Sequence, residues 1–553
     1  MRQYEMLELS VRGAPPEGSE ALSAVSALFR RGGEETRVDG FYAGNGVYKV
    51  RFLPEKTGAY RYEITGDALA APQRGAFTVD AAERGKHGPV RAEGIHLRHA
   101  DGTWYHGFGT TVYALAHQSE ALIAETMETL AASPFNKLRT CVFPKHYTYN
   151  ENNPAYYPFE RRAGLPERAF PASETPPVPQ KRETRDDYWD VNRPCYAFWD
   201  ALDGRLKQLE KLGIETDLIL FHPYDRWGFS NLSQEDSLVY LSYLLRRIAA
   251  YPHVWWSLAN EYDLCLNKTD DDWRTFARFI AAHDPYRHLL SNHNCFKLWD
   301  PAEKEITHVS WQTRELSRVA EAQRRWNKPV LVDECRYEGN VPEFWGNVSG
   351  ADMTSRFWKV TVQGGYCTHG ETFLPGTAQG GRATATGEAD VVWWAKGGKL
   401  NGESPERICF LREIVESLPG PLEPLGGGLG DVIGMSDGEV QDMIDHAPPG
   451  FNHFLARMAR MNEAERDRFF GIEYQYRGHV GEDAYLYYLD DQCAAAVQVE
   501  LPANRYYRVE VLDTWAMTRE TVAEHASGTV RAALPGRPYM AVLAVAEPHS
   551  KSV

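Results

Sequence analysis

Residues 253–263 have the sequence HVWWSLANEYD. The segment follows a Tyr-Pro pair, continues through a nearly unbroken apolar run and reaches its first polar pair at Asn260 and Glu261. A short apolar run rich in Trp, Val and Leu between turn signals is typical of a strand buried on both faces, as in a parallel sheet. We therefore expect Glu261 to stand where a buried strand ends, at the mouth of the core.

A second segment has the same form. Residues 328–334, KPVLVDE, place an apolar strand directly before Glu334. The chain between the two glutamates is long enough for about two strand–helix units. In a barrel of alternating strands and helices, the loops at the carboxyl ends of the strands build the active site. We expect both carboxylates at that face of one barrel.

Strand and helix patterns alternate from about residue 95. Helical spacing is found over 120–132, 199–212 and 233–250, with Ser233 as an N-cap and Gly213 as a C-terminal stop. Eight strands are expected, at 104–109, 136–142, 216–222, 253–261, 287–294, 306–312, 329–334 and 365–371. Eight is the number that closes a (β/α)8 TIM barrel, so the expected fold class is α/β.

Patterns of alternating apolar and polar residues flank the barrel on both sides. Such alternation around Gly-bearing turns predicts antiparallel strands with one wet face. We expect an immunoglobulin-like or fibronectin-like β-sandwich over 1–85, the catalytic barrel over 90–420, a connecting segment over 421–467 and a second β-sandwich over 468–553.

The composition favours an uncharged partner. The formal net charge of −16 disfavours nucleic acid and membrane surfaces, because both attract basic patches. The amino terminus has no basic segment followed by an apolar run, and no segment has the apolar length of a membrane span, so we expect a cytoplasmic protein. The eight cysteines form no close Cys-x-x-Cys pair, and we expect neither a metal nor another cofactor. A monomer and a homo-oligomer are both compatible with this composition.

One connection in the expected barrel is unusually long. Residues 143–198 follow the second strand and carry Pro, Tyr and charged residues with no clear period. Loops longer than about 15 residues in compact domains tend to be functional or disordered. The aromatic residues favour a wall over the active-site mouth, and a disordered surface insertion is the alternative.

Two carboxyl groups at strand ends that face each other across a barrel suit glycoside hydrolysis. In retaining enzymes one carboxyl protonates the leaving oxygen and the other, about 5–5.5 Å away, attacks the sugar. The substrate would then be an oligosaccharide or a glycoside. Two alternatives stay open: a catalytically silent carbohydrate-binding protein, and a metal-dependent amidohydrolase-type barrel. The second alternative needs a His-x-His pair on the first strand, where the sequence offers only His106.

These features resemble clan A of the glycoside hydrolases, the retaining family-five-like and apiosidase-like barrels with β-sandwich domains at both ends. The resemblance rests on Asn260-Glu261 at the end of the fourth strand and on Glu334 at the end of the seventh. It implies that Glu261 is the acid/base, that Asn260 holds the sugar 2-hydroxyl and that Glu334 is the nucleophile.

The same resemblance implies further substrate-binding positions. Arg139 ends the second strand, where clan members often keep an Arg near the nucleophile, and His222 and His293 end the third and fifth strands. The sixth strand departs from the clan pattern, with Trp311 and Gln312 in place of a Tyr. The eighth strand carries Glu371 where a Trp platform is common. We expect Arg139, His222, His293, Trp311 and Glu371 to line the sugar site.

Overall fold

The structure, a computed structural model, describes residues 1–170, 187–374, 392–426, 432–450, 456–472 and 476–548. It divides into two compact units. Unit 1 comprises residues 1–93, 97–312 and 370–401, and unit 2 comprises residues 94–96, 313–369 and 402–553. Across the described residues, no helix combines the length and the apolar character needed to cross a membrane.

Eight parallel strands form the barrel. They are β10 (Phe108–Thr111), β11 (Lys137–Cys141), β14 (Glu215–Phe221), β15 (Val254–Ala259), β16 (Leu290–Ser291), β17 (Val309–Gln312), β18 (Val330–Glu334) and β20 (Tyr366–His369). Their order in the sheet is β16-β15-β14-β11-β10-β20-β18-β17. This is the order of a (β/α)8 barrel opened between its fifth and sixth strands. The Thr307 N–H donates to the Leu290 carbonyl at 2.9 Å across that opening, so the barrel is nearly closed and the predicted fold class is confirmed.

The helices of unit 1 begin and end where local chemistry requires. They are α1 (Glu120–Ala131), α2 (Tyr196–Lys211), α3 (Gln234–Ile248), α4 (Asp270–His283) and α7 (Trp393–Lys396), with short 3-10 turns η1 (Leu115–His117), η2 (Phe229–Asn231) and η3 (Tyr262–Leu264). The Ser233 hydroxyl accepts from the Asp236 N–H, which confirms the predicted cap. Gly213 has a φ of 69°, the left-handed conformation that favours glycine after a helix.

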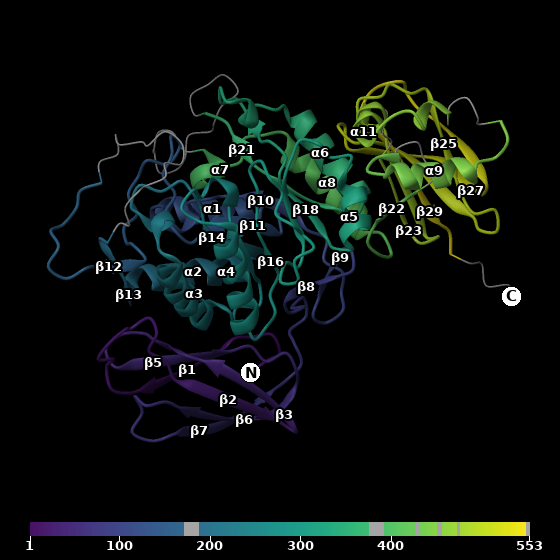
Figure 1. The fold of residues 1–553 in the computed structure, drawn as a ribbon. Coiled ribbons are helices and arrows are strands. Elements are labelled where there is room, and N and C mark those ends of the chain that lie inside the picture. The colour runs from purple at the N-terminus through teal and green to yellow at the C-terminus, as the bar shows by residue number, and fades with distance from the viewer. Residues whose placement is uncertain (171–186, 375–391, 427–431, 451–455, 473–475, 549–553) are drawn as a thin grey trace. The chain divides into compact units, whose positions relative to one another are not determined.

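The first 79 residues form two antiparallel sheets (Figure 1). One has the order β1-β5-β4 and the other β3-β2-β6-β7. The strands are β1 (Leu7–Arg12), β2 (Ser26–Arg31), β3 (Glu34–Asp39), β4 (Phe41–Tyr42), β5 (Val47–Phe52), β6 (Gly58–Thr65) and β7 (Gln73–Val79), followed by the pair β8 (Val90–Glu93) and β9 (His96–His99). Phe29 and Phe52 stack at 3.9 Å in their shared core, as expected of a sandwich.

Unit 2 contains β18, β20 and a carboxyl-terminal group of antiparallel strands. Its other barrel elements are β19 (Glu338–Gly339), η4 (Phe344–Gly346), α5 (Val319–Trp326), α6 (Gly350–Val362) and α8 (Ser404–Glu416), followed by α9 (Asp437–Asp445) and α11 (Glu463–Ile472). The strands β22 (Glu423–Pro424), β23 (Tyr476–Val480), β24 (Ala484–Tyr488), β29 (Met540–Ala546), β26 (Tyr507–Asp513) and β27 (Thr518–Ala526) form a six-stranded sheet in this order. β25 (Ala496–Glu500) pairs with β28 (Thr529–Ala533), and the two sheets share one apolar core.

The first barrel strand lies later in the chain than its sequence pattern predicts. The expected strand at 104–109 is wrong, because β10 starts at Phe108. Trp104 instead forms an antiparallel bridge with Arg98, whose guanidinium lies 4.6 Å from the indole centroid. Trp104 and Tyr105 thus pair with β9 before the barrel begins, and Phe108, Gly109 and two threonines form the strand itself.

The long connection at 143–198 contains structure of its own. Strands β12 (Phe159–Arg161) and β13 (Trp189–Pro194) pair antiparallel, and the Trp189 indole N–H donates to the Trp227 carbonyl at 2.8 Å. The segment is therefore not the periodless loop that the sequence suggests, although its residues 171–186 lie outside the described part. Phe143, Phe159, Tyr188 and Trp189 of this connection join the core of unit 1.

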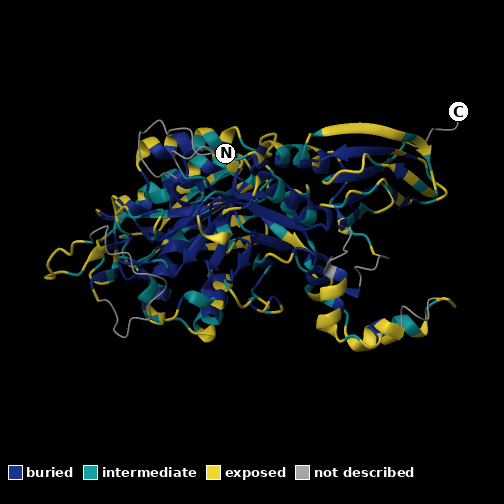
Figure 2. Cartoon of the chain, turned by 90° about the horizontal axis from the view of Figure 1, so that it is seen from above, coloured by how far each residue is buried: buried dark blue, intermediate teal, exposed yellow. Residues whose placement is uncertain are grey.

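Charged side chains fill part of the barrel interior, whose strands are dark blue in Figure 2. Asp217 forms ion pairs with Lys137 at 3.1 Å and with Arg139 at 3.4 Å. Deeper in the barrel, Glu215 accepts a hydrogen bond of 2.8 Å from the indole N–H of Trp255. Burial raises the pKa of Glu215 to about 8, because a charged carboxylate is poorly solvated there.

Replacing Glu215 with Gln is expected to stabilise the protein near neutral pH. Folding raises the pKa of Glu215, so burying its carboxyl group lowers the free energy of unfolding wherever the unfolded chain would be ionised. This loss of stability is absent below the unfolded pKa, grows as the pH rises and is complete above about 8. A shift from 4.5 to about 8 corresponds at pH 7 to about 3 kcal/mol, which Glu215→Gln should recover while it keeps an acceptor for Trp255. Denaturant unfolding between pH 5 and 8 measures this, with exposed Glu128→Gln as control. A Gln variant less stable than the parent at pH 7 would contradict a neutral Glu215.

Candidate active site

Glu261 follows β15 directly after Asn260, as predicted. All six residues of β15 are buried, and Glu261 then adopts φ 54° and ψ 59°, a left-handed conformation that is uncommon for a residue with a side chain. Its N–H points to Nδ1 of His293 at 3.4 Å, and its carbonyl accepts from the Leu264 N–H at 2.9 Å. Outliers of this kind persist where neighbouring contacts hold them, and they often mark functional sites.

Both oxygens of the Glu261 carboxyl group have hydrogen-bond donors. The Tyr224 hydroxyl donates to Oε2, and the Gln312 side-chain amide donates to Oε1 at 3.3 Å. Tyr224 lies in the loop after the third barrel strand, and Gln312 is the last residue of β17. Three strand ends therefore fix the carboxyl group of Glu261, a residue that is buried with 7% of its surface exposed.

Asn260 is oriented by two donors. Its Oδ1 accepts from the Tyr113 hydroxyl at 2.8 Å and from the Arg139 guanidinium at 3.4 Å. An amide whose oxygen is held in this way presents its nitrogen as a donor, so Asn260 can donate to a hydroxyl of a ligand. Arg139 is fully buried, and its ion pair with Asp217 connects the site to the charged interior of the barrel.

The two predicted histidines differ in position. His293 lies against Glu261, because its ring faces the Glu261 N–H and its carbonyl accepts from the Tyr262 N–H at 2.9 Å. His222 faces the chain instead, with Nε2 at 3.1 Å from the Phe143 carbonyl. Burial, followed by the charge of Lys145, lowers the pKa of His222 to about 3. His222 is therefore neutral, and its described contacts hold the start of the long connection.

Gln312, the last residue of β17, contacts the carboxyl group of Glu261. Successive side chains of a strand point to opposite faces, so Trp311 is not expected on the face from which Gln312 reaches Glu261. Trp311 is half-buried, and its role in substrate binding stays a prediction. The sequence pattern therefore identified the end of the sixth strand correctly, but it did not show that Gln312 is the residue that contacts the Glu261 carboxyl group.

Glu334 and Glu371 occupy other strand ends. Glu334 is the last residue of β18 in unit 2, is buried, and its carbonyl accepts from the Thr313 N–H at 3.0 Å. Glu371 begins β21 (Glu371–Thr372) in unit 1 and accepts from the Asn401 N–H at 2.6 Å. Glu261 thus follows the fourth strand of the barrel after Asn260, and Glu334 is the last residue of the seventh. The catalytic and binding roles predicted for Glu334 and Glu371 stay predictions.

A buried lysine within a group of aromatic rings is absent from the sequence prediction. Lys145 Nζ lies 3.4 Å from the ring centroid of Tyr113, 4.4 Å from that of Tyr224 and 4.9 Å from that of Tyr147. Cations are attracted to ring faces at such distances. Tyr113 bonds to Asn260 and Tyr224 to Glu261, so this lysine supports both polar groups of the site.

Trp394 completes this group from a distant part of the chain. Its ring centroid lies 4.9 Å from that of Tyr147 and 5.8 Å from that of Tyr149. Tyr147 and Tyr149 belong to the long connection, whose aromatic content already indicated a wall beside the site. No sequence pattern indicated Trp394, because it lies more than 20 residues after the eighth strand and so is not at a strand end.

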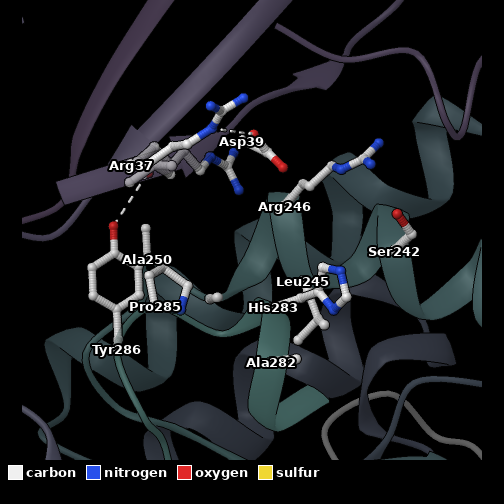
Figure 3. A pocket seen from close by; sticks show the side chains of 13 residues that line it. Arg37, Asp39, Ser242, Leu245, Arg246, Ala250, Ala282, His283, Pro285 and Tyr286 are labelled. Carbon is white, nitrogen blue, oxygen red and sulfur yellow. Dashed lines mark hydrogen bonds and ion pairs between the residues drawn. The ribbon is translucent and has the colours of Figure 1, made fainter. Parts of the chain in front are cut away.

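A separate cavity of about 190 Å³ lies between the amino-terminal sheets and helices α3 and α4 (Figure 3). Arg37, Asp39, Arg246 and Tyr286 are among the residues that line it. Its helical residues come from the last turns of α3 and α4. α3 leads directly into the start of β15, so this cavity lies at the opposite face of the barrel from Glu261.

Three family models match parts of this chain. Residues 91–419 match the family described as "Apiosidase-like, catalytic domain", residues 1–67 match a domain of unknown function (DUF5060) and residues 474–544 match another (DUF5605). A search of curated proteins gave no match.

Solved structures extend the comparison to the whole chain. A protein of Bacteroides vulgatus ATCC 8482 that is assigned as a glycoside hydrolase is 32% identical, with 99% of both chains covered and a TM-score of 0.78. A family 5 glycoside hydrolase from the same organism shares the fold at 14% identity, with 84% of this chain and 94% of that chain covered and a TM-score of 0.58. The chain belongs to the apiosidase-like family and is a glycoside hydrolase.

Proposed function

We propose that this enzyme is a retaining glycosidase in which Glu334 is the nucleophile and Glu261 the acid/base. The observation that carries the proposal is the fixed Glu261 carboxyl group at the end of the fourth strand, with Glu334 at the end of the seventh. The carboxyl ends of barrel strands converge on one face. The proposal requires the two carboxyl groups to lie about 5–5.5 Å apart.

The reaction then takes two displacements. In the first, a Glu334 oxygen bonds to the anomeric carbon, the bond from that carbon to the leaving oxygen breaks, and the Glu261 proton moves to the leaving oxygen. In the second, Glu261 removes a proton from water, the water oxygen bonds to the anomeric carbon, and Glu334 departs as a carboxylate. The sugar keeps its anomeric configuration, because each step inverts it once.

The residues around Glu261 support these two roles. Tyr224 and Gln312 hold the carboxyl group in one orientation through both steps, and preorganised donors avoid reorganisation during reaction. The Asn260 amide can donate to the sugar 2-hydroxyl, where a hydrogen bond that strengthens in the transition state accelerates the reaction. Two carboxyl groups suffice for this chemistry, so no metal ion is required.

We propose small oligosaccharides or glycosides as substrates. Tyr147 and Trp394 contact each other beside Tyr224, so aromatic rings lie next to the tyrosine that holds Glu261. The net charge of −16 favours uncharged sugars over polyanions. Analysis of the products from a soluble polysaccharide and its oligomers distinguishes the cases, and mid-chain cleavage of the polymer would contradict this preference.

The role of Glu261 is tested by replacing it with Ala. A glycosyl fluoride leaves without a proton, so Glu261→Ala should hydrolyse it at a near-normal first step but lose about 10²–10⁴-fold on substrates with basic leaving groups. Azide should attack the intermediate and give a glycosyl azide of retained configuration. Product analysis by proton NMR measures both, with exposed Glu128→Ala as control. An inverted first product from the parent enzyme, or an equal loss on all leaving groups, would exclude the proposal.

A further inference from the structure

Phe296 is the most exposed large apolar side chain among the described residues, with 84% of its surface accessible. It lies in the connection between β16 and β17, which leaves the barrel at the carboxyl ends of the strands. An exposed ring is useful for binding only if its backbone is held, because a mobile ring must be ordered at an entropic cost when a ligand binds.

The backbone around Phe296 is held by a single carboxylate. The N–H groups of Cys295, Phe296 and Lys297 all donate to Asp263, at 2.7, 2.7 and 2.8 Å. Hydrogen bonds to an ionised acceptor are stronger than neutral ones. Asp263 lies two residues beyond Glu261, so the segment that carries Phe296 is attached to the segment that carries the acid.

Neighbouring contacts attach the same segment to the rest of the site. Gln312, which donates to Glu261, also donates its N–H to the Asn294 side chain at 3.1 Å, and the Asn294 amide donates back to the Gln312 carbonyl at 3.3 Å. His293 lies against the Glu261 N–H. Phe296 is three residues beyond His293, and three residues of chain span at most about 11 Å.

We propose that Phe296 is a binding platform for the leaving-group part of the substrate, the sugar or aglycone on the far side of the scissile bond. The acid/base must reach the leaving oxygen, so the proposal assigns the ring that is attached to its loop to the leaving-group side. The apolar face of a pyranose or an aryl ring can cover the Phe296 ring and exclude water from it. This inference rests on the proposed role of Glu261.

The test compares two substrates of one sugar. The first is the nitrophenyl glycoside with the highest turnover in a screen, and the second is the corresponding glycosyl fluoride, whose leaving group offers nothing to cover the ring. Phe296→Ala should raise KM for the nitrophenyl glycoside roughly 10-fold, because the aryl group no longer buries apolar surface against the ring, and leave the fluoride unchanged. Phe296→Trp should restore the lower KM.

The control is Tyr506→Ala, which removes an aromatic residue that is 59% exposed and directly precedes β26 of the carboxyl-terminal sheet. This variant should leave KM unchanged for both the nitrophenyl glycoside and the glycosyl fluoride. The proposed platform would be overturned if Phe296→Ala and the parent enzyme had equal KM values for the nitrophenyl glycoside. It would also be overturned if Phe296→Ala raised KM equally for both substrates. These outcomes are separate from the proposed mechanism, which the parent enzyme tests through the stereochemistry of fluoride hydrolysis.

Discussion

Replacing Glu334 with Ala is expected to lower kcat by at least about 10⁴-fold, because the proposed covalent step loses its nucleophile. Added azide should occupy the space of the missing carboxylate, attack the anomeric carbon from the same side and release a glycosyl azide of inverted configuration. An activated substrate such as a dinitrophenyl glycoside should show the rescue, since it needs little help from Glu261. Steady-state kinetics and proton NMR of the product measure both effects.

The control for Glu334 is Glu343, an exposed carboxylate in the loop that follows the same strand. Glu343→Ala should keep the parent activity. A Glu334→Ala enzyme that retains more than a tenth of the parent kcat would exclude Glu334 as the nucleophile. Circular dichroism of the two variants establishes whether both are folded, and azide rescue is itself evidence of an intact site.

Replacing Asp203 with Ala is expected to destabilise unit 1 by about 3–5 kcal/mol, the usual cost of breaking a buried ion pair from one side. Asp203 in α2 accepts two hydrogen bonds from Arg51 of β5, at 2.7 and 2.8 Å, and two from Arg247, at 3.0 and 2.8 Å. Both guanidinium groups are buried. The variant leaves them without this counter-charge, and it removes a link between the amino-terminal sheets and the barrel helices.

Asp200 is the matched control, because it also pairs with Arg247 but is 71% exposed. Asp200→Ala should cost less than about 1 kcal/mol, as exposed pairs do. Urea unfolding followed by tryptophan fluorescence measures both variants. If Asp203→Ala and Asp200→Ala were equally mild, the buried cluster would not contribute as described.

The same cluster gives an expectation for acid. Burial alone would raise the pKa of Asp203, but hydrogen bonding and charge from Arg51, followed by the charge of Arg247, hold it below its usual value. A depressed carboxyl pKa stabilises the fold above the unfolded value, near 3.8, and this contribution is lost as the pH falls through the folded value. The parent protein should therefore lose stability below about pH 4, and Asp203→Ala should lack this part of the dependence.

Sequence patterns predicted the barrel well because its strands are buried on both faces. β14, β15 and β18 have every residue buried, which produces continuous apolar runs that end sharply at polar residues. The first strand was misplaced because aromatic residues of a preceding turn imitate a strand, whereas the strand itself contains Gly and Thr. Local patterns identify an element, and its exact position depends on its partners.

The two tryptophans of the fourth strand show that closeness in sequence does not determine which residues contact Glu261. Trp255 and Trp256 precede Glu261 closely, but Trp255 bonds to Glu215 and Trp256 to Asp284. The groups that do hold Glu261 are Tyr224 and Gln312, which lie in different parts of the chain. Their roles follow from loop conformations, for which the sequence has no periodic signal.

The sequence by itself determined the fold class, the number of barrel strands and the position of Glu261, the acidic residue that follows the fourth of them, because strand burial and strand ends are local properties of the chain. Only the tertiary structure decided the surroundings of that acid: Lys145 among its rings, Trp394 beside them, and Asp263 holding the segment of Phe296. Each of these contacts joins residues whose spacing in the chain carries no information about their distance. They form only when closure of the barrel brings the strand ends to one face.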